Sequence, residues 1–405
     1  MSAKSNLFRL SGKVQHYQWG GHSFLPALLN LPNDGDQPFA EYWLGAHDNL
    51  SSEFEGPAVT PLNQYIRENP SVLGTTVKEQ YGRLPYLLKI LDVKDMLSIQ
   101  VHPSKQAAAM EFEKENQAGI ALTASHRNYK DNNHKPELMV ALSDFSLLHG
   151  FKPEEQLKAA IAAVPEFTFM QALFDEGGYE KLYGNLMSMK QAQVNEICKP
   201  LLERIFLQYE NQELSKNNPD FWAARAALTF NEPDKVDRGI FSIYLLNLVH
   251  LNPGEAIFQD AGLLHAYLEG QNLEIMANSD NVLRGGLTPK HIDVDELMKH
   301  VQFDPTDPVV LRGNRINEFE EVYSSPAPDF QLSRLTIPRD QLVSLHSSTV
   351  EIFLVMDGSV TVSENNEALK LSLGKGEAAL AFAGAKLLWT ATDNAVIFRA
   401  SVPAA

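Results

Sequence analysis

The sequence changes its pattern twice along its 405 residues, and this alternation limits the fold more than any other feature. Up to about Phe151, short apolar runs such as 84–91 and 137–142 are broken by Gly, Pro and Asn, which predicts strands. Between Pro153 and about Arg238, apolar residues recur at helical spacing. Residues 240–249 are again almost continuously apolar, which predicts a strand covered on both faces. We therefore expect a β unit that is interrupted by a helical insertion.

A second β-rich block lies near the carboxyl end. Residues 352–356 and 359–363 flank Asp357 and Gly358, which predicts a hairpin within a β-sandwich. The expected fold class is mainly β with a helical insertion. In this division, residues 1–152 and 239–322 form the first β unit, residues 153–238 form the helical insertion and residues 323–405 form the second β unit.

Composition narrows the range of functions. Hydrophobic residues make up 44% of the chain and charged residues 21%, as is usual for folded soluble proteins. With neither a signal peptide nor a run of about 20 apolar residues, we expect a cytoplasmic protein. The formal net charge of −17 disfavours nucleic acid and anionic membranes as partners, because they carry charge of the same sign. A small anionic ligand would need a local cluster of Lys and Arg. We expect a monomer, with a homodimer as the alternative.

The single cysteine, Cys198, limits the choice of metal ligands. It excludes an intrachain disulfide and any zinc site built from several cysteines. A metal would therefore be held by His, carboxylate and amide groups.

Gln100 and His102 form the first candidate pair of ligands. On a strand, residues two apart project from the same face, so both would face one ion while Ile99 and Val101 point into the core. The alternative is a solvated polar face of a strand.

Lys135 and Glu137 form the second candidate pair, at the start of another apolar run. On one face, the ammonium of Lys135 would stabilise an ionised Glu137. Pro136 cannot donate a hydrogen bond to a neighbouring strand, so it belongs at a strand start or edge. A polar loop before a strand explains the same residues.

Residues 253–267 contain a Pro-Gly turn, a short strand, a second Gly turn and then His265. This order resembles the second motif of cupin barrels, in which the His is a metal ligand, although Asp260 stands where that motif usually has Pro. Downstream, Arg284 precedes two glycines that would let the backbone approach a ligand, and Lys290 follows closely. The alternatives are a structural histidine and a glycine-hinged surface loop.

Four segments together resemble a known family. Residues 39–45, 100–103, 134–137 and 281–290 look like the signature blocks of type I phosphomannose isomerases, in the family's order. The similarity runs from Val14 to about Asp293. The resemblance implies one Zn²⁺ per chain, held by Gln100, His102, Glu137 and His265, and an essential Arg284. It also implies pocket residues at Trp19, Lys89, Ser98, His134, Lys135, Tyr267, Glu274, Asp280 and Lys290.

The family's architecture is a cupin-type jelly-roll barrel that is interrupted by a helical domain and followed by a second β-barrel. In the second barrel no His lies in the turn at 383–386, where a cupin ligand would stand, and His346 is the only histidine there. We therefore expect that this barrel binds no catalytic metal.

The implied reaction interconverts mannose 6-phosphate and fructose 6-phosphate through an enediol, with Arg284 complementing the negative charge. His134 is a natural acid or base for ring opening, but strand alternation would turn it away from Glu137 unless Pro136 disturbs the strand. Lys135, Asp280 and Glu274 compete for proton transfer. Phosphate binding is assigned to Lys290, Arg284, Lys89 and Ser98.

Two rival functions remain. A cupin oxygenase would use the same barrel with iron, but iron sites favour two histidines and a carboxylate over a set that includes Gln100. A sugar-phosphate-binding protein without catalysis is disfavoured because the signature positions are filled.

Overall fold

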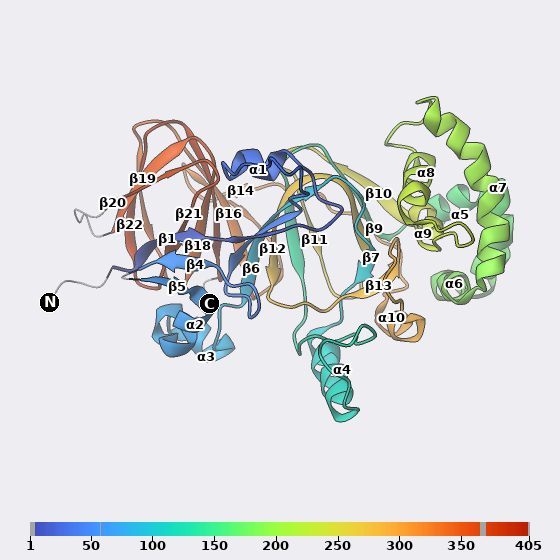
Figure 1. Ribbon diagram of the computed structural model, residues 1–405, viewed down its shortest axis with the longest axis horizontal. Coiled ribbons are helices and arrows are strands. Elements are labelled where there is room, and N and C mark those ends of the chain that lie inside the picture. The colour runs from blue at the N-terminus through green and yellow to red at the C-terminus, as the bar shows by residue number, and fades with distance from the viewer. Residues whose placement is uncertain (1–4, 57, 365–369, 404–405) are drawn as a thin grey trace.

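A computed structural model describes residues 5–56, 58–364 and 370–403. It is mainly β-sheet, with helices gathered at one end. Figure 1 shows the helical insertion at one end, a central β unit in the middle and a second β unit at the other end. The candidate ligands lie in the central unit, on strands that come from both sides of the insertion.

The central β unit is a ten-stranded sheet whose main path runs β10-β9-β12-β6-β3-β2. Its longest strand, β12, also pairs with β7 and β8, which in turn pair with β13 and β11. Because β12 touches so many strands, it brings together segments that are far apart in sequence. The strands are β2 (Lys13–Gln15), β3 (Glu41–Gly45), β6 (Tyr86–Val93), β7 (Ile99–Val101), β8 (Glu137–Ala141), β9 (Phe145–Phe151), β10 (Leu246–Leu251), β11 (Ala256–Gln259), β12 (His265–Ala277) and β13 (Leu283–Gly286).

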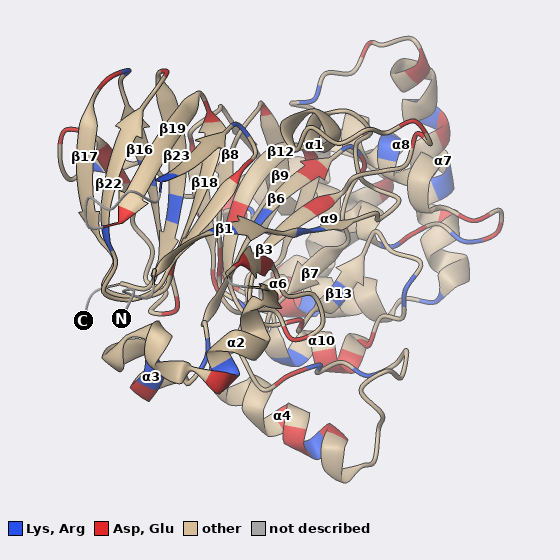
Figure 2. Ribbon diagram, turned by 60° about the vertical axis from the view of Figure 1, so that its left-hand side comes forward, with Lys and Arg blue, Asp and Glu red and all other residues tan. Residues whose placement is uncertain are grey.

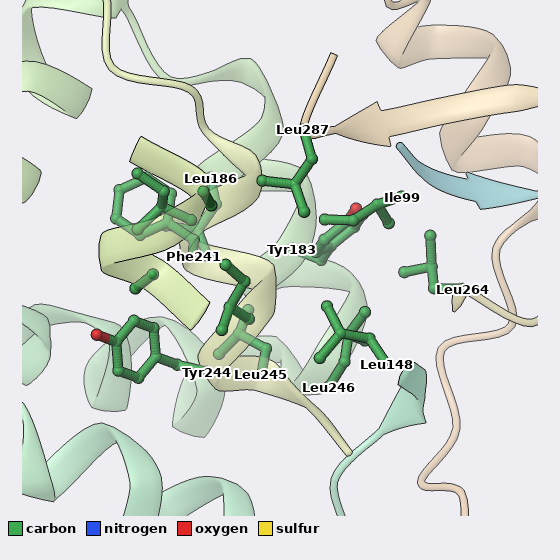
Figure 3. Packing of buried hydrophobic residues seen from close by; sticks show 14 of the residues in the cluster. Ile99, Leu148, Tyr183, Leu186, Phe241, Tyr244, Leu245, Leu246, Leu264 and Leu287 are labelled. Carbon is green, nitrogen blue, oxygen red and sulfur yellow. The ribbon is translucent and has the colours of Figure 1, made fainter. Parts of the chain in front are cut away.

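The chain between β9 and β10 is largely helical. The helical insertion consists of α5 (Glu154–Ala163), η2 (Pro165–Phe167), α6 (Thr168–Ser188), α7 (Gln191–Glu210) and α8 (Pro219–Phe230). Buried apolar side chains of these helices form one core with residues of β7, β9 and β10. Figure 3 shows this packing, with Tyr183 of α6 beside Ile99 of β7. Burial of this shared apolar surface fixes the insertion on the central sheet.

The run at 240–249 is not one strand. It folds as helix α9 (Gly239–Leu245) followed by β10, which starts at Leu246. Every residue of α9 is buried, so the helix needs no polar face and its sequence lacks helical periodicity. A fully buried helix and a fully buried strand have the same apolar signature, and the prediction of a strand over the whole run was wrong.

The second β unit consists of a nine-stranded sheet and a four-stranded sheet that share an apolar core. The larger sheet has the order β14-β15-β16-β23-β18-β21-β1-β4-β5, and the smaller has the order β17-β22-β19-β20. The strands are β1 (Leu7–Ser11), β4 (Glu53–Glu55), β5 (Val59–Pro61), β14 (Asn314–Arg315), β15 (Glu320–Tyr323), β16 (Gln331–Ile337), β17 (Leu342–His346), β18 (Glu351–Asp357), β19 (Ser359–Glu364), β20 (Lys370–Gly374), β21 (Ala378–Ala381), β22 (Lys386–Ala391) and β23 (Ala395–Ser401).

Strands β1, β4 and β5 come from the start of the chain, yet they extend the sheet of the carboxy-terminal block. Leu7 is paired with Ala381 in this arrangement. The expected division, which placed residues 1–152 wholly in the first β unit, therefore does not follow the sheets at this point.

The predicted hairpin at Asp357 and Gly358 does not form. β18 pairs with β21 and β23 in one sheet, whereas β19 pairs with β20 and β22 in the other. Gly358 has φ of +72°, and a Cβ there would lie 1.9 Å from the carbonyl oxygen of Asn394. The Asp-Gly turn thus carries the chain from one sheet to the other, and the predicted β-sandwich is present.

The remaining helices lie outside the sheets. They are α1 (Phe24–Leu28), α2 (Leu62–Glu68), η1 (Pro70–Leu73), α3 (Thr75–Tyr81), α4 (Lys105–Gln117) and α10 (Val294–His300). Among the described residues no single helix has the length and apolarity of a membrane span, and only the pair 154–163 and 165–188, bent by 117°, reaches both together. Figure 2 shows acidic and basic positions both among the central strands and on outlying helices such as α4 and α7.

Candidate metal centre and active-site cavity

Three predicted ligands converge in the central β unit. The Nε2 atom of His102 lies 3.4 Å from Oε1 of Glu137, and Nε2 of His265 lies 3.3 Å from Oε2. Glu137 begins β8 and His265 begins β12, while His102 directly follows β7. All three side chains are buried, and their candidate ligand atoms lie within 4.8 Å of one another.

The hydrogen bonds of both imidazoles leave Nε2 free for a metal. Nδ1 of His102 lies 2.8 Å from the carbonyl oxygen of Asn281, and Nδ1 of His265 lies 2.9 Å from that of Leu263. A carbonyl oxygen only accepts, so each Nδ1 carries a proton and donates it. Burial lowers the pKa of His102 to about 4, which keeps its Nε2 unprotonated at neutral pH.

Three buried atoms here lack a hydrogen-bond partner among the described residues, namely both Nε2 atoms and Oε2 of Glu137. Buried polar groups are normally satisfied, and three unsatisfied acceptors within 4.8 Å of one another are suited to a bound cation. Two imidazoles and a carboxylate are donors that suit Zn²⁺, and the carbonyl partners of Nδ1 are the usual means of orienting such ligands. The residues present therefore fit a zinc ion.

Lys135 stabilises the carboxylate of Glu137, as the sequence predicted. Nζ of Lys135 lies 3.0 Å from Oε1 of Glu137, and both side chains are buried. Burial acts to raise the pKa of Glu137, but nearby groups, first among them the ammonium of Lys135, outweigh it and hold the pKa well below its ordinary value. Glu137 is therefore ionised, as a metal ligand must be.

Gln100 lies next to this cluster. Its backbone pairs with that of His265 on one side and that of Arg284 on the other. Ile99 and Val101 are completely buried while Gln100 is half-buried and lines the cavity, which confirms the predicted alternation along this strand. Its role as a fourth ligand stays a prediction.

A cavity of about 710 Å³ opens beside Glu137. It gathers most of the predicted polar residues from seven separate stretches of sequence. Those that line it are Trp19, Lys89, Ser98, Gln100, Lys135, Glu137, Tyr267, Glu274, Asp280, Arg284 and Lys290.

One wall of the cavity is a network of paired charges. Nζ of Lys89 lies 3.3 Å from Oε2 of Glu41 and 4.4 Å from the ring centre of Trp43. Burial lowers the pKa of Lys89, but nearby carboxylates, chiefly those of Glu41 and Glu274, outweigh it and raise the pKa above its ordinary value. Lys89 is therefore a fixed cation that is already partly neutralised.

Glu274 has an unusual protonation behaviour. Burial, reinforced by the charge of Glu137, raises its pKa to about 7. Its Oε2 accepts a 2.6 Å hydrogen bond from the hydroxyl of Tyr267. A carboxyl group with this pKa can both accept and donate a proton near neutral pH.

Two further cations line the cavity. Arg284 and Lys290 line it, and among the described residues neither has a carboxylate within 4.0 Å. Burial lowers the pKa of both groups, and the charge of Arg284 lowers that of Lys290 further. Two cations that are close together without acidic partners are suited to a bound anion.

Comparisons with known proteins agree with this site. The family model for the catalytic domain of type I phosphomannose isomerase matches residues 7–154. The mannose-6-phosphate isomerase of Escherichia coli K12 is 34% identical in an alignment that covers 91% of this chain and 93% of that protein. The chain belongs to the type I phosphomannose isomerases. The mouse member of the family is 33% identical, over 99% of this chain and 97% of its own length.

Solved structures of phosphomannose isomerases have the same fold. The Salmonella typhimurium enzyme, crystallised with fructose 6-phosphate and zinc, aligns with a TM-score of 0.86 at 32% identity. The alignment covers 99% of this chain and 100% of that one. A second structure of mannose 6-phosphate isomerase, in a zinc-bound holo form, gives the same TM-score and identity.

His134 lies elsewhere than expected for a catalytic residue of a phosphomannose isomerase. Its Nε2 lies 2.9 Å from Oδ2 of Asp329, which is 1% exposed, and it is not among the residues that line the cavity. His134 lies in the irregular segment before β8, and its imidazole is held against Asp329. Its role in catalysis stays a prediction.

The two glycines after Arg284 let β13 pack closely on the helices. A Cβ on Gly285 would lie 2.7 Å from the hydroxyl of Tyr183, and one on Gly286 would lie 2.4 Å from Cα of Gly239. The close approach that the structure shows is between β13 and the helices α6 and α9, and an approach of the same backbone to a ligand stays a prediction. It places the loop that carries Lys290 against the helical insertion.

Sequence reasoning missed several residues of the phosphomannose isomerase cavity. Glu41 and Trp43 belong to one of the signature segments, and their spacing of two on a strand is the signal that could have placed them on one face. Thr229 and Phe230 at the end of α8 line the cavity from the helical insertion. No local pattern marks these two, because they reach the site only through tertiary packing.

Proposed function

We propose that this chain interconverts mannose 6-phosphate and fructose 6-phosphate with one zinc ion held by Gln100, His102, Glu137 and His265. The observation that carries the proposal is the set of three unsatisfied, buried ligand atoms beside a cavity that is lined by the cations Arg284 and Lys290. Family membership and the zinc- and sugar-phosphate-bound Salmonella relative support it. Gln100 is included because its strand neighbour is His265 and because it lines the cavity.

A zinc ion at this point would supply a Lewis acid that polarises the oxygens at C1 and C2 of the sugar. The protein supplies binding and charge. Arg284, the strand neighbour of Gln100, complements the negative charge of the enediol. Lys290 and Ser98 bind the phosphate, since Lys290 is a cation that no described carboxylate neutralises.

Three groups of the cavity move protons. Asp280 and Lys135 open the sugar ring, with Asp280 accepting a hydroxyl proton and Lys135 donating to a sugar oxygen. Asp280 is suited to this because its side chain is 42% exposed and a hydrogen bond and nearby cations outweigh burial and hold its pKa below the ordinary value. Glu274 transfers the proton between C1 and C2, because its pKa of about 7 allows uptake and return.

We also propose that both β units are cupin-type jelly-roll barrels. The long β12 that gathers ligands and the two packed sheets of the second unit support this. The proposed division is residues 1–152 with 239–322, then 153–238, then 323–405, with β1, β4 and β5 joining the second unit. Location in the cytoplasm and a monomeric state stay predictions.

Product analysis tests the proposed function. The zinc-loaded protein is incubated with mannose 6-phosphate under recorded oxygen pressure, and products are identified by NMR. We expect fructose 6-phosphate in equilibrium with substrate and no oxygen consumption. Oxygen uptake would instead indicate a cupin oxygenase, and tight binding without product would indicate a non-catalytic binding protein.

Two controls make the assay specific. Unphosphorylated mannose should react far more slowly, because it cannot use the cations Arg284 and Lys290. Removal of metal with a chelator should abolish turnover, and stoichiometric Zn²⁺ should restore it.

A further inference from the structure

His47 is a buried histidine that the proposed mechanism does not use. It lies two residues after the end of the signature segment 39–45 and is 6% exposed. Its Nε2 lies 3.1 Å from Oδ2 of Asp280, a residue 233 positions away that lines the cavity. The imidazole itself is not among the lining residues, and within the described part of the chain its one hydrogen bond to a residue of the cavity is the contact with Asp280.

The hydrogen bonds of His47 define its tautomer. The backbone N–H of Asn49 donates to Nδ1 over 3.3 Å, so Nδ1 carries no proton. The proton of the neutral ring is therefore on Nε2, which donates to Asp280. The ring also packs edge-on against Trp43 at 5.0 Å between centroids, which limits its rotation.

Asp280 is held from its backbone as well. Its N–H donates over 2.7 Å to Oδ2 of the half-buried Asp131. With the backbone and Oδ2 both fixed, only Oδ1 remains for a ligand, since no described residue donates a hydrogen bond to it. Ionisable groups that act on Asp280 from other elements are Lys89, Lys135, Lys130, Tyr17 and Asp131.

We propose that His47 is a positioning residue, whose Nε2–H fixes the carboxylate of Asp280 with one oxygen directed to the sugar. The proposal rests on the proposed function, which gives Asp280 its role in ring opening. The hydrogen bond between His47 and Asp280 can nevertheless be tested without measuring turnover. His47 thereby acts on the reaction through Asp280 and does not touch substrate.

The test compares two variants of the zinc-loaded protein. His47→Phe keeps the ring that packs on Trp43 but removes the donor, whereas the amide of His47→Gln can still donate to Asp280. The pKa of Asp280 is measured by ¹³C NMR of labelled aspartate carboxyls, assigned with Asp280→Asn. We expect a rise of about one pKa unit or more in His47→Phe and little change in His47→Gln, because a lost hydrogen bond disfavours the charged form.

Kinetics give a second measurement. In His47→Phe the acid limb of the kcat/KM profile should move to higher pH and kcat should fall roughly tenfold, the effect of about 1.4 kcal/mol on the barrier. Zinc content should stay at the wild-type value. His22→Phe is the matched control, since His22 contacts Asp36 at 2.8 Å outside the cavity and should change none of these quantities.

Several outcomes would overturn the proposal. An unchanged Asp280 pKa in His47→Phe, or equal shifts in both variants, would show that the donor does not matter. If His47→Phe does not fold, ¹⁵N NMR of the wild-type imidazole decides, because an Nε2 that carries no proton would contradict the proposed hydrogen bond. Absence of isomerase activity in the wild type would refute the proposed function but leave both NMR measurements valid.

Discussion

The central β unit and the second β unit both bury ionisable side chains, but they differ in whether those side chains find partners within the chain. In the second unit, Arg399 makes two hydrogen bonds of 2.9 and 2.7 Å to Glu351 and one of 3.0 Å to Glu320. In the central unit, His102, Glu137 and His265 leave three buried atoms without a partner.

The difference separates structural charges from functional ones. A buried ion pair that is fully hydrogen-bonded needs nothing further, whereas unsatisfied acceptors need a ligand that the chain does not supply. Figure 1 shows the two units next to each other in one chain, so both can be compared under the same solution conditions. The contrast predicts that substitutions in the central unit abolish chemistry and that those in the second unit reduce stability.

The largest effect is expected from His102→Ala and His265→Ala. Each removes one ligand and leaves a cavity in its place, so bound zinc should fall from one per chain to nearly none, and turnover by roughly 10³-fold or more. Zinc is measured by elemental analysis and turnover by the product assay. His346→Ala, at an exposed histidine of the second unit, is the control and should change neither. Stoichiometric zinc in either ligand variant would refute the assignment.

Arg284→Ala should separate catalysis from metal binding. Arg284 carries positive charge beside the cavity but is no ligand, so turnover should fall by roughly 10²- to 10³-fold while zinc stays bound. Arg284→Lys keeps the charge but loses the planar fork and should recover only part of the rate. Near-normal turnover of Arg284→Ala would remove it from the mechanism.

Arg399→Leu tests whether the buried ion pairs of the second β unit contribute to stability and not to catalysis. It leaves Glu351 and Glu320 buried without a cation, so the free energy of unfolding should fall by about 3–5 kcal/mol, while zinc content and turnover of the folded protein persist. Arg334→Leu is the control, because Arg334 pairs with Glu321 in the same sheet where both side chains are 32% exposed, and should cost about 0–1 kcal/mol. Loss of zinc in Arg399→Leu would contradict the separation of the two units.

The loss in Arg399→Leu should depend on pH. Burial raises the pKa of Glu351, although Arg399 acts against this. A carboxyl whose folded pKa lies above its unfolded value stabilises the protein most when protonated, and that stability is lost as pH rises through the folded pKa. Without Arg399 the folded pKa rises further, so the deficit should widen between pH 5 and pH 8. Chemical denaturation across this range measures it.

The sequence predicted most of the site but less of the architecture around it. Strand alternation was enough to place Ile99 and Val101 in the core, because it depends only on neighbouring residues. The position of α9 and the route of the chain at Gly358 depend on which sheet or core a segment meets, and local patterns do not contain that information. For the same reason, the sequence did not identify Thr229 and Phe230 as residues that line the cavity.

For the ligands, the resemblance of four ordered segments connected residues that spacing alone could not connect. Gln100 and His102 as a pair are equally consistent with a polar strand face, and only the family blocks connect them to Glu137 and His265. For His134 the resemblance transfers the residue's position in the sequence and not the orientation of its side chain, which the structure places outside the cavity lining. The partner that orients it, Asp329, lies 195 positions away.

The smallest predicted effect comes from this pair, which spans the two β units. His134→Asn and Asp329→Asn each remove one side of a 2.9 Å contact, and because Asp329 is buried each should lower the free energy of unfolding by about 1–3 kcal/mol. The double variant should cost less than the sum of the two, because both remove the same contact. Turnover should change little in all three, since Lys135 and Glu137 stay paired. If His134→Asn lost turnover by a hundredfold while Asp329→Asn did not, His134 would act in the reaction, and the division between structural and functional charges would have to be redrawn at this residue.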